Sequence, residues 1–186
     1  QSGAIGTHIM VLLRERGIGI SKWVTTGNQS DVDIADCIAY FATDPETKVI
    51  VTYMEGCPDG AKLMRSLNAA RKAGKPVIVI KVGTTEAGAA AAASHTASLA
   101  GSDAVVDAAF RQSGAWRADS LIELVDMVAA ANHGKFPARP DVGLITISGG
   151  VGVLMTDEAT RLGLRVPPMP KAGRKKLLDI EPMANP

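Results

Sequence analysis

The chain has 186 residues, of which 46% are apolar, 21% charged and 4% aromatic, with a formal net charge of +1. The apolar fraction excludes a disordered chain, and the balanced charge and few aromatics give no reason to expect a nucleic-acid partner. Two cysteines, Cys37 and Cys57, are too few for a disulfide scaffold, and no apolar run is long enough to span a bilayer. We therefore expect a cytoplasmic protein that binds neither nucleic acid nor membrane.

Apolar, β-branched runs alternate with segments of helical spacing along the chain. The runs predict short buried strands at residues 18–24, 49–53 and 77–82. The intervening segments predict helices, one capped by Asp31 or Asp33, over residues 34–41, 61–70, 103–112 and 120–132. The alanine-rich stretch 87–93 fits either a helix or an ordered loop. Strands that alternate with helices indicate an α/β fold, with a parallel sheet covered on both faces.

A polar stretch with two prolines, residues 134–141, separates two periodic regions and is the best candidate for a linker. After it we expect a strand over 142–147, then a glycine-rich turn and a helix. The sequence therefore predicts a first domain over 1–133 and the incomplete N-terminal part of a second, similar domain over 142–186. We interpret the chain as a piece of a longer protein.

An internal repeat links these two regions. SGAIGTHIMVLLRERGIGI, from Ser2, aligns without a gap on SGGVGVLMTDEATRLGLRV, from Ser148. Each copy reads as a Ser-Gly turn, a helix, a glycine stop and a strand. Glycine lets a ligand approach the backbone, and the free N–H groups of a first helical turn favour an anion such as phosphate. Ordinary α/β turn chemistry would explain either copy alone. The candidate phosphate-binding residues are Ser2, Gly3, Ala4, Ser148, Gly149 and Gly150.

One histidine differs in its setting from the other two. His8 lies inside a predicted helix and His133 at a helix C-terminus, where packing or capping explains them. His95 lies in SHTASLAG, after the strand at 77–82, and loops at the carboxyl ends of parallel strands line the ligand crevice. A base, a metal ligand and a nucleophile are all open roles for its imidazole. No second His or Cys is spaced to complete a metal site, so we expect none.

A carboxylate is predicted at the same edge of the sheet. Glu55 ends the strand VIVTYME and precedes Gly56. A carboxylate bonded to one imidazole nitrogen fixes the tautomer and leaves the other nitrogen as a nucleophile. A capping or solvent-facing acid is the alternative for Glu55. The cysteines fit packing roles, as do Trp23 and Trp116.

Four segments carry a resemblance to a known family. QSGAIG, TTGNQSDVD, YMEG and GTTEAGAAAAASHTASLAG, in this order, resemble the ADP-forming acyl-CoA synthetases, relatives of succinyl-CoA synthetase. The resemblance covers nearly all of residues 1–133 and implies a flavodoxin-like, three-layer domain. Residues 142–186 look like the start of the next CoA-ligase domain. SHTASLAG is the most specific of the motifs.

The resemblance implies a reversible reaction in which acyl-CoA, ADP and phosphate give a carboxylic acid, CoA and ATP. By motif match, His95 is the histidine that carries the phosphoryl group and Glu55 the glutamate that orients it. The two Ser-Gly helix starts would stabilise the phosphohistidine. The full enzyme would use CoA, ATP or ADP, Mg2+ and phosphate. It would need a Rossmann-like CoA-binding domain and an ATP-grasp domain, which these residues lack, so we expect the fragment alone to be inactive. Such synthetases commonly form homo-oligomers.

Two other readings remain. The chain could be a non-catalytic, ligand-sensing synthetase-like module of a protein acetyltransferase, although the retained His95 and Glu55 argue against a degenerate site. It could also be a flavodoxin-like FMN binder, but it lacks an aromatic-rich loop to sandwich a flavin.

Overall fold

The computed structural model describes residues 1–96 and 102–184, with the backbone alone for 92–96. The chain divides into two compact units, Gln1–Lys135 and Phe136–Pro186. The division falls inside the stretch 134–141 that the sequence marks as a linker. Each unit is described by itself below.

A parallel sheet forms the middle of the first unit. Its described strands are β1 (Ile50–Met54), β2 (Val77–Lys81) and β3 (Trp116–Ala118), in the order β1-β2-β3. The first two are the apolar runs that the sequence predicts. β3 was not predicted, because three residues with an arginine in the middle give no apolar run, and Trp116 was interpreted only as a packing residue.

Helices surround the sheet at the places that the spacing predicts, and polar side chains cap most of them. Asp33 caps α2 through a reciprocal capping box with Asp36, which decides between the two aspartates that the sequence allowed. The alanine-rich stretch forms a helix. The bounds are α1 (Gly3–Glu15), α2 (Ile34–Thr43), α3 (Gly60–Lys72), α4 (Glu86–Thr96), α5 (Asp103–Ser113) and α6 (Leu121–Asn132).

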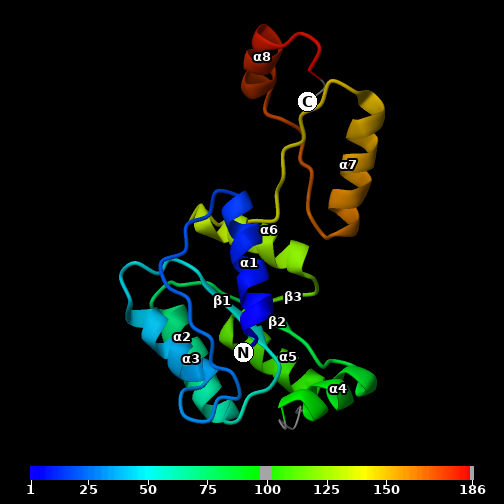
Figure 1. Cartoon of the computed structure of the whole chain (residues 1–186). Coiled ribbons are helices and arrows are strands. Elements are labelled where there is room, and N and C mark those ends of the chain that lie inside the picture. Colours follow the sequence, from blue (N-terminus) through cyan, green and yellow to red (C-terminus); the bar gives the residue numbers. More distant parts are fainter. Residues whose placement is uncertain (97–101, 185–186) are drawn as a thin grey trace. The chain divides into compact units, whose positions relative to one another are not determined.

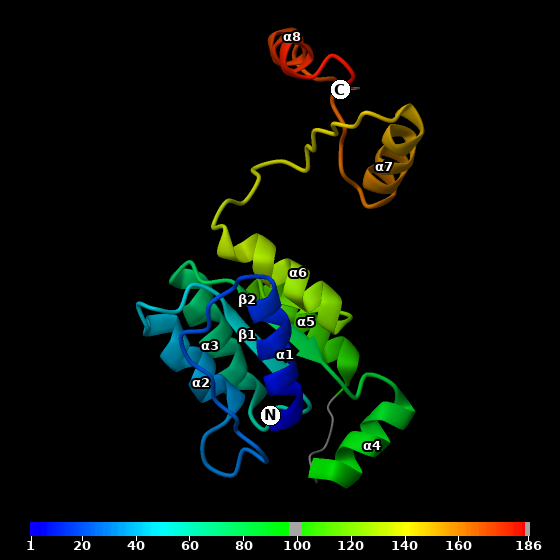
Figure 2. The same ribbon diagram turned by 45° about the horizontal axis from the view of Figure 1, so that its top comes forward.

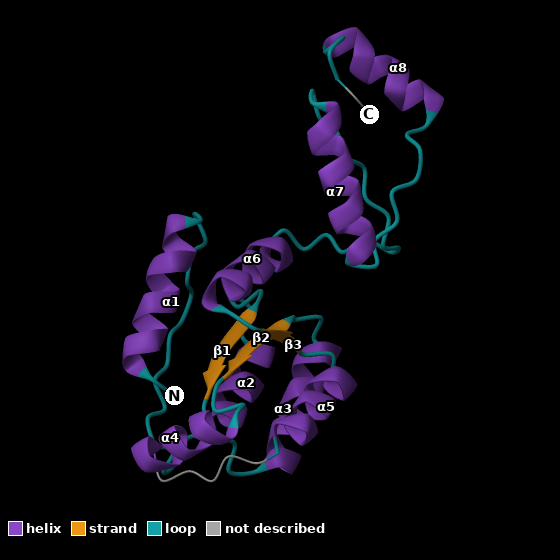
Figure 3. Cartoon of the chain, turned by 90° about the vertical axis from the view of Figure 1, so that its right-hand side faces the viewer, coloured by secondary structure: helices purple, strands orange, loops and turns teal. Residues whose placement is uncertain are grey.

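The two faces of the sheet bury separate apolar clusters (Figures 1 and 3). Helices α2, α3 and α5 cover one face, where Ile38, Leu67 and Phe110 pack on Val79. Helices α1 and α6 cover the other, where Leu13 and Leu124 pack on Ile78. Side chains of successive strand residues point to opposite faces, so Val79 and Ile78 serve different clusters. The first unit is therefore a three-layer α/β sandwich, as expected. Helix α4 lies outside both helical layers, beyond the end of the sheet (Figure 2).

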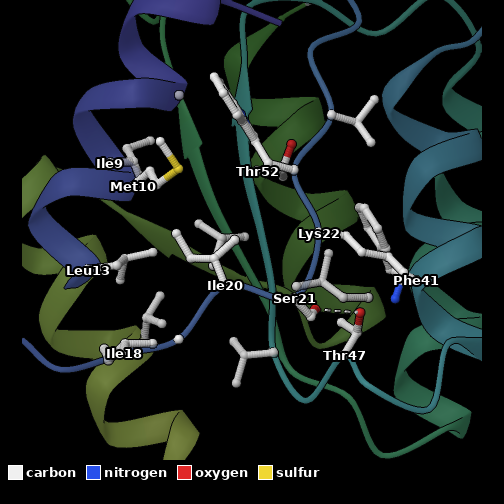
Figure 4. A pocket seen from close by; sticks show the side chains of 18 of the residues that line it. Ile9, Met10, Leu13, Ile18, Ile20, Ser21, Lys22, Phe41, Thr47 and Thr52 are labelled. Atoms are coloured by element: carbon white, nitrogen blue, oxygen red, sulfur yellow. Dashed lines mark hydrogen bonds between the residues drawn. The ribbon is translucent and has the colours of Figure 1, made fainter.

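The strand predicted at residues 18–24 is wrong. This segment faces the free edge of β1 across a cavity of about 590 Å³ (Figure 4). Both of its ends have other partners: the Ile18 N–H donates to the Leu13 carbonyl at the end of α1, and Lys22 pairs with Asp44 and Glu46. In the described sheet β1 pairs with β2, and residues 18–24 add no ladder to it.

The second unit holds two helices, α7 (Gly149–Arg161) and α8 (Lys171–Ile180). The strand predicted over 142–147 is also wrong, because a strand needs a paired ladder and the described residues of this region form isolated bridges, such as the parallel one between Asp141 and Arg165. Many large apolar side chains of this unit are exposed, among them Val153, Leu154 and Ile180. No helix in the described ranges of either unit is long and apolar enough to cross a bilayer.

The internal repeat holds at the level of hydrogen bonds. Helices α1 and α7 begin and end at equivalent residues, and Ser2 and Ser148 cap them in the same way. At the far ends, Gly17 and Gly163 both have positive φ, at 70° and 77°. This backbone suits glycine, and the amide after each glycine donates to a carbonyl inside the helix in both copies. Local sequence therefore builds the same helix twice.

Candidate active site

The carboxyl end of β1 presents a buried carboxylate on a fixed backbone. Glu55 follows the last residue of β1 and is 8% exposed. The side-chain oxygen Oε1 of Gln1 accepts hydrogen bonds from the amides of Glu55, at 2.5 Å, and Gly56, at 3.0 Å. Gln1 immediately precedes the cap of α1, so this contact joins the start of the helix to the end of the strand.

The first turn of α1 lies at the same edge. The Ser2 hydroxyl accepts from the Ile5 amide at 3.4 Å, which leaves the amides of Gly3 and Ala4 without an acceptor inside the helix. Thr25 lies against this turn, since a Cβ added to Gly3 would be 3.6 Å from Thr25 Cγ2. Free amides and the positive end of the helix dipole favour an anion here.

A second glutamine fixes the loop opposite the helix start. Gln29 Nε2 donates to the Gly56 carbonyl at 3.3 Å, and its Oε1 accepts from the Ile34 amide at 3.0 Å. Gln29 has a φ of 57°, in the left-handed region. The motif TTGNQSDVD thus has a structural reason, because its glutamine ties the loop to the residue after Glu55. Sequence reasoning quoted both glutamines within motifs but gave neither a role.

The charge of Glu55 affects the ionisation of Tyr53, a residue of β1. Burial raises the pKa of the Tyr53 hydroxyl, and the charge of Glu55 and a hydrogen bond to its carboxylate raise it further. The two residues are two apart on a strand and therefore share a face. The phenol therefore stays protonated at neutral pH.

The backbone of His95 lies in α4, which follows β2. Because β1 and β2 are parallel neighbours, Glu55 and the connection into α4 leave the sheet at the same edge. The His95 side chain lies outside the described residues, as does the rest of SHTASLAG from residue 97. The pairing of Glu55 with His95 therefore stays a prediction.

The other three predicted phosphate-binding residues belong to the second unit. The Ser148 hydroxyl accepts from the Val151 amide at 3.5 Å, so Gly149 and Gly150 offer their amides as Gly3 and Ala4 do in the first unit. Both glycines are exposed, and a Cβ on Gly150 would meet nothing within 4 Å. That the two helix starts share one anion stays a prediction.

Neither cysteine has the environment of a nucleophile. Burial raises the pKa of both thiols, and nearby aspartates raise that of Cys37 further. Thiols with raised pKa values are protonated and unreactive at neutral pH.

The cavity beside α1 extends from Gln1 and Ser2 along β1, but apolar side chains such as Met10 and Leu13 line its middle (Figure 4).

Fold and site together define a flavodoxin-like α/β domain with a buried carboxylate and a helix N-terminus at the carboxyl edge of its sheet. The family described as the succinyl-CoA ligase like flavodoxin domain matches residues 1–131. The chain belongs to this family, as the sequence motifs indicated.

Its relatives are synthetases. The chain is 45% identical over 166 residues to the alpha subunit of an ADP-forming acetate–CoA ligase of Pyrococcus furiosus, covering 89% of this chain and 36% of the relative. It is 38% identical to an ADP-forming acetate–CoA ligase of Methanocaldococcus jannaschii, covering 98% and 26%. An acetyl-coenzyme A synthetase of Candidatus Korarchaeum cryptofilum, solved with phosphate and ADP, superposes with a TM-score of 0.83 at 40% identity, covering 92% and 37%. The chain thus spans about a third of these proteins or less.

Proposed function

We propose that this chain is the phosphohistidine-bearing part of an ADP-forming acyl-CoA synthetase. The observation that carries the proposal is the convergence, at one edge of the sheet, of Glu55 and the first turn of α1. The connection into the helix of His95 leaves the sheet at that same edge. The names of the relatives favour a ligase over the ligand-sensing alternative.

The chemistry proceeds in three transfers. Phosphate attacks the carbonyl of acyl-CoA, and the thiolate of CoA leaves as the acyl phosphate forms. A ring nitrogen of His95 then attacks phosphorus, the bond to the acyl oxygen breaks, and the carboxylate leaves. Finally an oxygen of ADP attacks the phosphohistidine, which yields ATP and restores the free imidazole.

Residues of this chain would act mainly on the second transfer. Glu55 accepts the N–H of the other ring nitrogen, which fixes the tautomer and stabilises the imidazole as it gains positive charge. The amides of Gly3 and Ala4 donate to the phosphoryl oxygens, as fixed donors do in an oxyanion hole. Gln1 holds the backbone of Glu55 in place for this task.

The second unit would supply the other helix start. We assign residues 142–186 to the N-terminal part of a second flavodoxin-like domain, with Ser148, Gly149 and Gly150 as its anion turn. The exposed apolar side chains of α7 support this assignment, since a complete domain would bury them. Residues 134–141 would be the linker.

The remaining partners would be domains outside these residues. A Rossmann-like domain would bind CoA, and an ATP-grasp domain would bind nucleotide and Mg2+, in the same chain or another. The described residues contain no group of three or more His, Cys, Asp or Glu side chains that could hold a metal ion. The substrate would be a small carboxylic acid. The relatives include a 4-hydroxybutyrate–CoA ligase of Nitrosopumilus maritimus as well as acetate–CoA ligases, so family membership alone does not choose the acid.

Labelling of the whole enzyme with γ-phosphate-labelled ATP tests the proposal. We expect an acid-labile, base-stable label on the wild type and none on His95→Ala. Glu55→Gln should slow labelling by roughly 10²–10⁴-fold, the usual loss when an imidazole loses its orienting carboxylate. His8→Ala is the matched control, because His8 is exposed on α1 and should label normally. Wild-type labelling of His95→Ala would overturn the assignment.

A further inference from the structure

A buried lysine lies at the carboxyl end of the sheet, and the mechanism above does not use it. Lys81 is the last residue of β2 and is 6% exposed. In the parallel register it lies beside Met54, the residue before Glu55. Buried ammonium groups are rare in proteins unless a counter-charge or a function retains them.

The polar partner of Lys81 that the described residues show is a backbone carbonyl. Its Nζ donates to the carbonyl of Val82, which uses one of three donors. No carboxylate of the described residues forms an ion pair with it. Because side chains alternate along β2, Lys81 continues the face of Val79, which packs against α3 and α5, whereas Glu55 continues the face of Tyr53.

The nearest acidic groups already have partners. Arg117 of β3 donates to both oxygens of Asp103, the first residue of α5, at 2.9 and 3.0 Å. Asp107 pairs with Arg111 and, at 3.5 Å, with Arg117. Two arginines thus match the two carboxylates of α5, and the Lys81 charge is left over.

Electrostatics agree with an ammonium that needs an anion. Burial is the main cause that lowers the pKa of Lys81, and the positive charge of Arg117 lowers it further. The negative charges of Asp103 and Glu55 act in the opposite direction and raise it. An anion brought to this edge would favour the charged form of Lys81 and accept from its two remaining N–H donors. The connection from β2 into α4, the helix of His95, begins at the very next residue.

Resting on the function proposed above, we propose that Lys81 is the buried cation that binds the phosphate or phosphoryl anion at this edge of the sheet. Lys81 would contact the anion from the end of β2 with its two remaining N–H donors. Phosphate would be the ligand of the free site, and the phosphoryl group would take its place during turnover.

Lys81→Met tests the assignment, because methionine matches the lysine stem and removes the charge. In the whole enzyme we expect phosphate binding, measured by calorimetry, to weaken by about 10-fold to 100-fold, the usual worth of a charged hydrogen bond. The KM for phosphate should rise in parallel, and Lys81→Arg should retain most of the affinity. The melting temperature of each variant separates loss of binding from loss of fold.

Lys75→Met is the matched control. Lys75 also donates to backbone carbonyls, those of Phe41 and Asp44, but it lies before β2, at the opposite end of the sheet. It should leave phosphate affinity unchanged. Wild-type phosphate binding in Lys81→Met, or a lowered melting temperature with an unchanged KM for phosphate, would overturn the proposal. Calorimetry needs no turnover, so a failure here is distinct from the absence of a phosphohistidine.

Discussion

Helices α1 and α7 are equivalent in length, caps and end turns, yet they differ in what covers them. Ile9 and Leu13 of α1 are buried against α6 and the sheet. Met155, the equivalent of Ile9, is 38% exposed, whereas Ile9 is 7% exposed. Local sequence therefore determines where each helix begins and ends, and the surrounding elements determine whether its apolar face is buried.

Truncation of equivalent apolar residues should give the largest contrast. We expect Ile9→Ala to lower the free energy of unfolding of the first unit by about 2–4 kcal/mol, because it leaves a cavity in a packed cluster. Met155→Ala should cost less than about 1 kcal/mol, since partly exposed side chains lose little. Tryptophan fluorescence in urea reports the first unit, where both Trp23 and Trp116 lie, and amide exchange reports the second. Equal losses would contradict the comparison.

Replacing the equivalent glycines Gly6 and Gly152 by alanine should give the next largest difference in stability. A Cβ on Gly6 would lie 2.8 Å from Nε1 of Trp23, whereas a Cβ on Gly152 would lie 3.2 Å from Cγ2 of Thr146. Alanine stabilises a helix by about 1 kcal/mol relative to glycine, and a forced close contact destabilises the fold by about 1–3 kcal/mol. Gly6→Ala should therefore destabilise by about 1 kcal/mol in urea unfolding, and Gly152→Ala should be near neutral by amide exchange.

The control for that prediction removes the obstacle. Trp23 is 48% exposed, so its loss should be tolerated. In Gly6→Ala combined with Trp23→Ala, alanine should be stabilising relative to Trp23→Ala alone, with Trp116 as the fluorescent reporter. A Gly6→Ala variant as stable as the wild type would show that the tryptophan moves aside without cost.

The same difference between local and distant contacts explains which elements could be predicted from the sequence. Helix starts at Ser2, Asp33, Ser120 and Ser148 were predictable because the cap and the first turn are local in the chain. The strand predicted over 18–24 was wrong because Lys22 pairs with residues far along the chain. The shortness of β3 hid it from any pattern of apolar residues.

The residues of the candidate site also fall into those with a local sequence signal and those that depend on distant contacts. Glu55 and the Ser-Gly turns could be found from sequence, because strand ends and helix starts have local signals. The role of Gln1 depends on a contact with Glu55 across 54 residues, and that of Lys81 on the neighbours of β2. Lys81 did carry one signal, a charged residue that ends an apolar strand, and it was overlooked.

Loss of the two helix caps should give equal, smaller effects. Ser2→Ala and Ser148→Ala each remove one side-chain acceptor from a first turn, at a cost of about 1 kcal/mol. Amide exchange of Ile5 and Val151 should speed up by about the same factor, and Ser→Asn at either position should preserve protection. A much larger effect at Ser2 would mean that its role is tertiary.

Low pH should lower the stability of the first unit through Asp44, a buried acid that has no equivalent in the described part of the second unit. A hydrogen bond from Thr47 and the charge of Lys22 lower the pKa of the buried Asp44. A lowered folded pKa gives stability that is present above the unfolded value of about 3.9 and is lost as pH falls through the folded one. Asp44→Asn should therefore lower the urea midpoint at pH 7 and flatten its decline between pH 4 and pH 2. Asp126→Asn, at an exposed pair with Arg16, should leave the slope unchanged.

One carboxamide oxygen joins the first turn of α1 to the end of β1. Because Gln1 accepts from two successive amides, Glu55 and Gly56, any tilt of the helix start carries the backbone of Glu55 with it. The two backbone segments that carry the candidate anion donors and the candidate orienting carboxylate are thereby joined directly. A change at the first turn of α1 would therefore be transmitted to the strand end through this one side chain.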